Sequence, residues 1–316
     1  MSFPLVRHDA ARVDRPIAAW RDNVGASLAL DLAPPAAAAP TLHVLCWNAW
    51  IGRGDIAGLI TRIREGGYAR LGFPAGAPFV ALIQEAYRSD DSVPRTSNGA
   101  MARDYSRRGG HEHEIAAAAR ALGLNLRYAP SMRNGIERSD RGNAILASLP
   151  LADAVATELP FALQRRVITS ATIAVGSTAL RLHAAHFDPR GATARDLFGF
   201  AGRLRQAREL IRMVHAGTGM PHLLGADLNL ARQEREPAFR ALREAGFVTG
   251  IPARRTTWAH TYHRLPRLLL DWVLLAGGTT VRHFEVRRLD EHPRDQGAYV
   301  FGSDHHPLLA RLDFDH

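Results

Sequence analysis

Short apolar segments that end in polar side chains recur from Leu42 onward, and this alternation limits the folds the chain can adopt. The segments are too short for typical helices and rich in aliphatic residues, as buried strands are; they include "LHVLCWN", "FVALIQE", "ALRLHAAH", "HLLGAD" and "LLLDWVLL". Helix-like segments separate them, namely "DIAGLITRIRE", "EHEIAAAARALG", "EPAFRALREAG" and a long one from Thr193 to His215. Strands joined by helices or by short turns predict an α+β domain in which two packed sheets are covered by helices.

The segments outside this pattern lie at the N-terminus and after the second strand. Residues 1–40 are predicted to be an appendage, because "LAPPAAAAPT", Leu32 to Thr41, is typical of a stiff Pro/Ala linker; residues 41–316 form the folded domain. A polar insertion from Ala86 to Gly110 is interpreted as a lid or substrate-binding loop, or alternatively as a surface loop. Its arginines are Arg88, Arg95, Arg103, Arg107 and Arg108.

Cysteine usage and hydropathy exclude several classes of protein. The single cysteine, Cys46, lies in an apolar run, which favours a buried structural thiol over a nucleophile and excludes an internal disulfide. No stretch approaches the roughly 20 apolar residues of a membrane span, and the N-terminus lacks the continuous apolar core of a signal peptide. We therefore expect a cytoplasmic monomer.

Carboxylates, amides and histidines stand at the ends of several predicted strands. They are Asn48, Glu85, His186, Asp227 and Asn229. Carboxylate and amide oxygens suit Mg²⁺, or Mn²⁺, which prefer hard oxygen ligands. Zinc is less favoured, because there is one cysteine and no pair of histidines at helical metal-binding spacing beside a glutamate. His111 and His113 in "HEHE" are interpreted as an exposed helix entry rather than a chelating pair.

Asp271 is the most unusual residue of the chain, because it interrupts the apolar run "LLLDWVLL". A carboxylate buried there needs a cationic or hydrogen-bonding partner, unless it lies in solvent at a strand end. A histidine is the natural partner, since a carboxylate fixes the tautomer and orientation of an imidazole. The stretch "FGSDHHP" near the C-terminus supplies Asp304 and His305, although a polar turn before a last strand is the simpler reading of that stretch alone.

Seven motifs in order resemble the endonuclease/exonuclease/phosphatase superfamily, whose members include deoxyribonuclease I, apurinic endonucleases, neutral sphingomyelinases and inositol polyphosphate 5-phosphatases. They are "CWNAW", "LIQEA", "RGNAILAS", "HAAHFD", "LLGADLN", "LLLDWVLL" and "GSDHHP". The resemblance extends from about Leu42 to Phe314. The sequence departs from the commonest form of the family motifs at Ala226, which stands between glycine and aspartate, and in the insertion after Glu85.

The resemblance implies a deoxyribonuclease I-like, four-layer α/β/β/α sandwich of two mixed sheets. Glu85 would be the principal Mg²⁺ ligand, with Asn48 and Asp304 assisting. Asp227 would orient or deprotonate the attacking water, and Asn229 would help to hold it. The remaining residues would act on the substrate. Asp271 would pair with His305, which contacts the scissile phosphate, and His186 would donate a hydrogen bond to that phosphate or assist the leaving group. Arg141 and Asn143 of "RGNAI" would bind phosphate. His306 should point away from the site, since neighbours on a strand do.

The implied activity is metal-dependent phosphodiester hydrolysis, and a nuclease is the first hypothesis. Net charge is +9, and arginines such as Arg165 and Arg166 stand near the motifs, which favours a polyanionic substrate. All 40 basic residues are arginine, however, and this compositional bias weakens the argument. No array of aromatic and basic residues stands out. A phosphodiesterase or phosphatase acting on a lipid headgroup or small phosphoester is the alternative. A scaffold without activity is disfavoured, because every carried-over polar position is intact.

Overall fold

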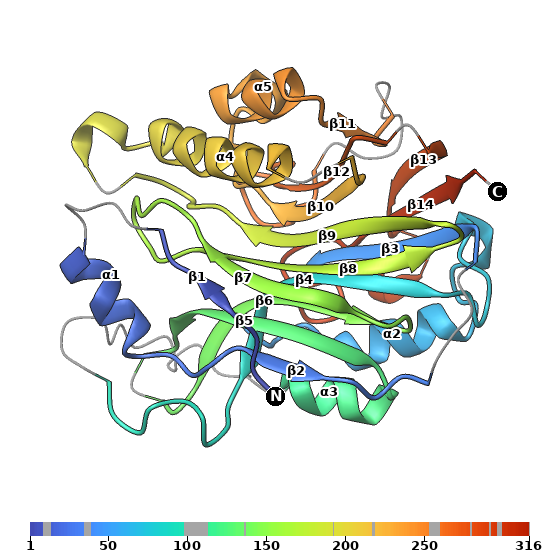
Figure 1. Ribbon diagram of the computed structural model, residues 1–316, viewed down its shortest axis with the longest axis horizontal. Helices are drawn as coiled ribbons and strands as arrows, with labels where there is room; N and C mark the ends of the chain where they lie inside the picture. The colour runs from blue at the N-terminus through green and yellow to red at the C-terminus, as the bar shows by residue number, and fades with distance from the viewer. Residues whose placement is uncertain are drawn as a thin grey trace.

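Two seven-stranded sheets lie face to face in the computed structural model, and helices cover their outer faces (Figure 1). The structure describes residues 1–8, 14–34, 39–97, 113–135, 137–191, 193–216, 219–252, 260–278, 280–290, 292–295 and 299–315. The first sheet has the order β1 (Leu5–Val6), β7 (Ala152–Glu158), β8 (Val167–Val175), β9 (Thr178–His186), β10 (His222–Asp227), β12 (Asp271–Ala276) and β11 (Val248–Thr249). The second has the order β13 (Val281–Arg288), β14 (Leu308–Phe314), β3 (Thr41–Asn48), β4 (Phe79–Arg88), β6 (Asp140–Ala147), β5 (Asn125–Arg133) and β2 (Leu28–Leu30). Both sheets are mixed, because β9 and β10 run parallel, as do β3 and β4.

The strands of the sandwich centre are apolar on both sides because each side faces a separate core. On β3, Val44 and Cys46 belong to the core between the sheets, whereas Leu45 and Trp47 belong to the core beneath α2 (Ile56–Arg64) and α3 (Ile115–Leu122). Helices α4 (Phe200–His215) and α5 (Pro237–Glu244) cover the other sheet (Figure 1). The predicted four-layer α/β/β/α sandwich is therefore confirmed, and Cys46 is buried as expected, where burial raises the pKa of its thiol.

The predicted helices begin and end largely where their capping residues stand. Asp55 caps α2 by accepting a hydrogen bond from the Gly58 amide at 2.8 Å, and Gly123 ends α3 in the left-handed conformation. The long helix predicted from Thr193 is shorter than expected. A 3₁₀ turn occupies Ala194–Asp196, and α4 begins only after Gly199, whose φ of +73° separates the two.

The N-terminal segment does not lie apart from the sandwich, and this corrects the prediction of an appendage over residues 1–40. β1 pairs with β7 at the edge of the first sheet, and β2 pairs with β5 at the edge of the second (Figure 1). Helix α1 (Asp14–Arg21) connects them, and Arg21 forms an ion pair with Glu158 of β7. The physical reason is that edge strands carry unpaired backbone groups, which two short apolar segments can satisfy. Residues 35–38 of the expected linker lie outside the described residues.

The first part of the expected insertion belongs to the sheet. β4 continues through Ala86 to Arg88, where Arg88 stands opposite Asp140 of β6. The Arg88 guanidinium is buried and donates to both carboxylate oxygens of Asp140, at 3.0 and 2.6 Å, so it is not available for substrate. Arg95 is described, whereas Arg103, Arg107 and Arg108 lie outside the described residues, and so does His111. His113 is partly exposed, 3.8 Å from Asp55.

The Arg88–Asp140 pair joins β4 and β6, two inner strands of the second sheet, and should contribute strongly to its stability. Replacing Arg88 with Ala leaves the fully buried Asp140 carboxylate without its counter-ion, which should lower the free energy of unfolding by about 3–5 kcal/mol. Arg287→Ala is the matched control, because its pair with Glu285 is half-exposed and should contribute less than about 1 kcal/mol. Urea denaturation measures both values. An equal decrease in the free energy of unfolding of the two variants would show that the buried pair stabilises the fold no more than the exposed one.

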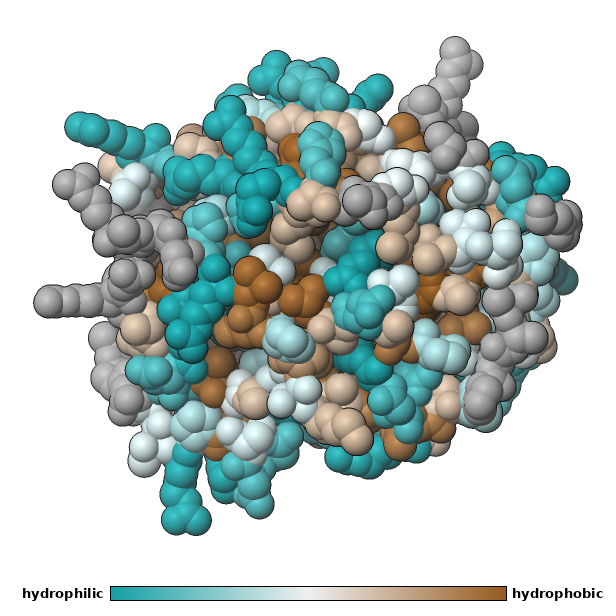
Figure 2. All heavy atoms as spheres, viewed as in Figure 1, coloured by the Kyte–Doolittle hydropathy of each residue, from teal (hydrophilic) through white to brown (hydrophobic). Residues whose placement is uncertain are grey.

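The viewed surface is mixed in polarity. Hydrophilic side chains project around its rim, and apolar side chains gather nearer the centre (Figure 2). None of the described helices is both long and apolar enough to cross a lipid bilayer.

Candidate active site

The sheet pairing brings the polar strand ends to one edge of the sandwich. Asp227, the last residue of β10, stands opposite His186, the last residue of β9, and opposite Asp271, the first of β12. On the facing sheet, Asn48 ends β3. The predicted gathering of these residues at one edge is confirmed.

A cavity of about 430 Å³ opens at this edge. Its lining includes eight of the ten predicted site residues: Asn48, Glu85, Arg141, His186, Asp227, Asn229, Asp304 and His305. The other two, Asp271 and Asn143, are buried behind the lining. Arg166, which the sequence places near the site, also lines it. Residues that the sequence did not indicate complete the lining, namely Trp50, Ile51, Gln164, Pro189, Tyr262, Arg264, Leu268 and Leu270.

Asp227 is oriented by the strand that carries it and by the facing sheet. A Cβ atom added at Gly225 would lie 2.6 Å from Leu82 and 3.1 Å from Cys46, so Gly225 faces the second sheet, and Asp227 two residues on faces the same way. One carboxylate oxygen accepts a hydrogen bond from Asn48 Nδ2 at 2.9 Å, and the other accepts one from the backbone amide of Asn229 at 2.9 Å. Burial and the neighbouring Asp271 carboxylate raise the pKa of Asp227. This carboxylate is held rigidly and has a raised affinity for protons.

His186 lies between two of the carboxylates of the cavity, those of Glu85 and Asp227. Its Nε2 is 3.0 Å from Asn229 Nδ2 and 3.4 Å from Asp227, and its Nδ1 is 3.8 Å from Glu85. If His186 Nε2 accepts a hydrogen bond from the side-chain amide of Asn229, the neutral ring carries its proton on Nδ1. Burial lowers the pKa of His186 well below its ordinary value, which favours the neutral ring. A neutral His186 can donate one hydrogen bond into the cavity without adding charge.

The predicted contact between Asp271 and His305 is confirmed in its geometry. His305 Nδ1 lies 2.7 Å from Asp271 Oδ2, both side chains are buried, and His305 Nε2 lies 4.0 Å from Asp227. The His305 carbonyl accepts from the Trp47 indole at 2.8 Å, and its amide donates to Ser303 Oγ, which fixes the backbone. Burial alone would lower the pKa of His305, but the Asp271 carboxylate outweighs it and raises the pKa to about 10. The raised pKa favours the charged form of the imidazole, which lines the cavity.

An Asp271→Asn variant tests this pair. Asparagine keeps the size of the side chain but removes the charge that stabilises the imidazolium, so the hydrolysis rate should fall about 100-fold. The affinity for divalent metal should stay within a few-fold, because Asp271 does not line the cavity. Metal titration and single-turnover kinetics measure the two quantities. A variant with the wild-type rate would show that His305 does not need Asp271.

Glu85 reaches the cavity through an irregularity in its strand. Val80 and Leu82 belong to the core between the sheets, and Gln84 continues this face by donating to the Gly225 carbonyl at 3.1 Å. Regular alternation would turn Glu85 toward the helices. A β-bulge, with Glu85 at φ +53°, instead directs its side chain into the cavity, and Ala86 resumes the helix-facing core.

The donor set at this end of the cavity fits a hard divalent cation. Glu85, Asp304 and Asn48 offer oxygen atoms, the type that Mg²⁺ and Mn²⁺ prefer. Burial raises the pKa of Asp304, and the charge of Glu85 acts in the same direction, so a cation would relieve the repulsion of this pair. Asp227, Asp271 and His305 also lie close enough to share an ion. That trio is the poorer site, because the Asp271 carboxylate raises the pKa of His305 and a protonated imidazole has no free lone pair for a metal ion.

The basic residues near the cavity divide into two kinds. Arg141 and Arg166 line it; Arg166 is held by Asp188 at 3.0 Å and Arg141 by Asn134 at 3.0 Å. Arg165, which the sequence places near the motifs, instead forms a buried ion pair with Glu158 and does not line the cavity. It therefore adds nothing to the charge argument for a polyanionic substrate.

Asn143, predicted to bind phosphate, joins the two sheets. Its side-chain amide donates to the Val167 carbonyl of β8 at 2.5 Å, and it faces a small hollow behind the cavity that Glu85 and His186 also line. The structure thus gives Asn143 a bond that positions the neighbouring Glu85 strand.

Aromatic residues at the cavity were missed from the sequence because they stand on loops. Trp50 lines the cavity and stacks on Tyr299, with ring centroids 5.4 Å apart. The guanidinium groups of Arg53 and Arg264 lie 4.1 and 5.8 Å from the Trp50 ring. The sequence signals for them are Trp50 in the motif "CWNAW" and the "TYHR" of the loop before β12, where the Tyr262 and His305 ring centroids are 5.1 Å apart. This array of aromatic and basic side chains does not stand out in the sequence, but the structure places it at the cavity.

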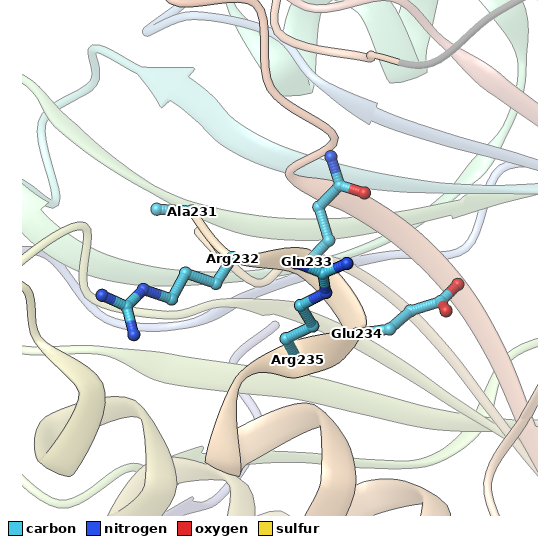
Figure 3. A pocket seen from close by; sticks show the side chains of 5 residues that line it. All are labelled: Ala231, Arg232, Gln233, Glu234 and Arg235. Carbon is cyan, nitrogen blue, oxygen red and sulfur yellow. The ribbon is translucent and has the colours of Figure 1, made fainter.

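A second, larger cavity of about 670 Å³ lies along the turn that follows Asn229 (Figure 3). Its described lining is Ala231, Arg232, Gln233, Glu234 and Arg235, and the side chains of Arg232 and Glu234 extend from the turn in opposite directions. This lining contains no histidine and only one acid. The smaller cavity therefore remains the candidate active site.

Comparisons with known proteins agree with this geometry. The model of the Endonuclease/Exonuclease/phosphatase family matches residues 45–305, so the chain belongs to that family. The members of this family are phosphoric ester hydrolases that depend on divalent metal ions. A search of curated proteins found no match.

Solved structures share the fold at low sequence identity. An endonuclease/exonuclease/phosphatase from Beutenbergia cavernae DSM 12333 has a TM-score of 0.56 and 18% identity, over 87% of this chain and 72% of that one. Sphingomyelinase C from Streptomyces griseocarneus has a TM-score of 0.54 and 18% identity, over 86% and 99%. The human Nocturnin catalytic domain, solved with a bound sulfate anion, has a TM-score of 0.52 and 14% identity, over 92% and 98%.

Proposed function

We propose that this protein is a divalent-metal-dependent phosphodiester hydrolase and that its substrate is nucleic acid. The observation that carries the proposal is the content of one cavity: an oxygen-donor cluster of Glu85, Asp304 and Asn48 beside a buried carboxylate, Asp227, and a carboxylate-paired imidazole, His305. Phosphodiester hydrolysis needs these parts, because negative charge develops on the phosphate oxygens while water must lose a proton.

The residues divide this work among them. Glu85, Asp304 and Asn48 would hold Mg²⁺ or Mn²⁺, which supplies Lewis-acid stabilisation of charge on the phosphate. Asp227 would orient the attacking water and accept its proton, since the raised pKa of its carboxyl makes it a better base. His305 and His186 would donate hydrogen bonds to the phosphate oxygens. Asn229 would hold His186, and Arg141 would add positive charge beside the phosphate.

The cavity rim favours a nucleic acid over a small phosphoester. Trp50 and Tyr299 form an aromatic stack, and Tyr299 is 54% exposed, so a base can reach it. Arg264 lies beside Trp50 and within the cavity lining. Unpaired bases stack on aromatic side chains while arginines track the phosphates, an arrangement typical of proteins that bind single strands.

A lipid headgroup is the second candidate, and one feature favours it. Leu265 is 87% exposed and directly follows Arg264, so an apolar side chain projects beside the cavity. Exposed apolar residues next to basic ones are typical of membrane contact. The fold shared with sphingomyelinase C is compatible with such a substrate.

Two variants separate these candidates. Trp50→Ala should raise KM for single-stranded DNA or RNA about 10- to 100-fold, because stacking of one base contributes about 1–3 kcal/mol. Leu265→Ser is the matched control and should leave this KM within about twofold. Binding of catalytically dead protein to the same strand should weaken steeply as salt rises, through counter-ion release. Hydrolysis of phospholipid vesicles that needs Leu265, with no cleavage of nucleic acid, would contradict the nuclease proposal.

A further inference from the structure

Three histidines gather outside the proposed active site. His260 and His263 stand on the loop before β12, and His306 stands just before β14. One ring nitrogen of each lies within 4.8 Å of those of the other two. His306 is buried and does not line the cavity, as the sequence predicted for it, although it precedes the strand rather than alternating along it.

Two of the three rings direct a nitrogen at each other in a hydrogen bond, which a bound ion would replace. His263 Nδ1 and His306 Nε2 are 3.0 Å apart, and the ring planes of His260 and His306 are nearly perpendicular, with centroids 5.6 Å apart. Two nitrogens bound to one tetrahedral Zn²⁺ at about 2.05 Å stand roughly 3.3 Å apart. A small outward movement of two rings would therefore admit an ion between them.

The surroundings of the cluster supply the second layer of such a site. Asp290 Oδ1 lies 3.7 Å from His306 Nδ1, beyond hydrogen-bond distance but on the side from which a carboxylate orients many zinc-bound imidazoles. Arg288 brings a positive charge near His260, but its guanidinium binds both oxygens of Asp290 at 2.9 and 3.0 Å. Its closer contact with His260 is to the backbone carbonyl at 2.7 Å, whereas the ring nitrogen is 3.5 Å away.

We propose that His260, His263 and His306 form a second metal site, for Zn²⁺ or a similar borderline transition metal, distinct from the oxygen-donor cluster at Glu85. Three imidazoles and no carboxylate in the first layer discriminate against Mg²⁺, and a water or external anion would complete the tetrahedron. The site joins the loop that carries Tyr262 and Arg264 to the segment that carries Asp304 and His305. Occupancy would fix two cavity-lining residues relative to the active-site histidine, so the role of the metal is positioning.

Cobalt titration of chelator-treated full-length protein tests this site, with excess Mg²⁺ present to occupy the oxygen-donor cluster. Co²⁺ in a tetrahedral nitrogen site absorbs visible light strongly, whereas octahedral oxygen-bound Co²⁺ absorbs weakly. We expect one equivalent with the tetrahedral spectrum, displaced by Zn²⁺, and a higher melting temperature for the loaded protein.

The variants locate the ion. His263→Ala and His260→Ala should each weaken cobalt binding at least tenfold, while His283→Ala, an exposed histidine of β13, should leave it unchanged. Glu85→Gln should also retain it, which separates this site from the proposed catalytic metal. Circular dichroism and the melting temperature without metal identify a variant that fails to fold, in which case the other histidine variant decides. No tetrahedral spectrum, unchanged binding in both histidine variants, or loss of binding in Glu85→Gln would each overturn the proposal.

Discussion

An Asp227→Asn variant should hydrolyse phosphodiesters about 10³- to 10⁴-fold more slowly than the wild-type protein, because an amide cannot accept the proton of the attacking water. The side chain is nearly isosteric, and the Asn229 backbone amide can still donate to its oxygen. In that orientation the new amide nitrogen faces Asn48 Nδ2, so the contact with Asn48 is lost. The loss of rate should therefore appear in kcat, with a smaller cost in stability from the broken contact.

Three measurements separate a catalytic role for Asp227 from a structural one. Single-turnover rates give the chemical step, metal titration gives the affinity of the oxygen-donor cluster, and thermal unfolding gives stability. Asp91→Asn serves as the control, since the side chain of Asp91 is 98% exposed and should leave all three unchanged. If Asp227→Asn cleaved within tenfold of the wild-type rate, another group would have to activate the water.

The part of the site that follows from strand periodicity was predictable. Polar residues that end parallel strands must meet at one edge of a sheet, which places Asp227 opposite His186. The burial cost of a carboxylate within "LLLDWVLL" predicted a partner for Asp271, and His305 lies 2.7 Å from it. Both inferences rest on local physical constraints that the sequence displays directly.

The basic residues show where sequence reasoning fails. An arginine in a polar stretch of sequence is expected to be exposed, yet Arg88 and Arg165 are buried in ion pairs. Arg88 pairs with Asp140, 52 residues away along the chain, and Arg165 pairs with Glu158, 7 residues away. Ion pairing in the folded structure decides which guanidinium reaches the cavity, and this pairing cannot be predicted from composition. The same holds for the N-terminal strands, because two or three residues of β1 or β2 gain their conformation only from the sheet edge they join.

Loop geometry accounts for the remaining omissions. Trp50 lies in a turn at φ +46°, and Tyr262 and Arg264 lie in a loop without regular structure, so no periodicity indicates their direction. The motif "LIQEA" indicates Glu85 as a site residue, but the bulge that directs its side chain into the cavity is visible only in the pairing of β4 with β6.

The central claim is that a divalent metal held at Glu85 drives phosphodiester hydrolysis in this cavity, and its most direct test is the rate of wild-type and Glu85→Gln protein as a function of metal concentration. Chelator-treated wild-type protein should be inactive on a single-stranded oligonucleotide and regain activity with Mg²⁺ or Mn²⁺. Glu85→Gln should lose about 10³-fold at the same metal concentration, a transition-state loss of about 4 kcal/mol, because a neutral amide binds the cation weakly. The Glu85 side chain is 19% exposed, so the substitution should leave the unfolding temperature almost unchanged. Full activity after chelation, or equal metal dependence of the two proteins, would contradict the account.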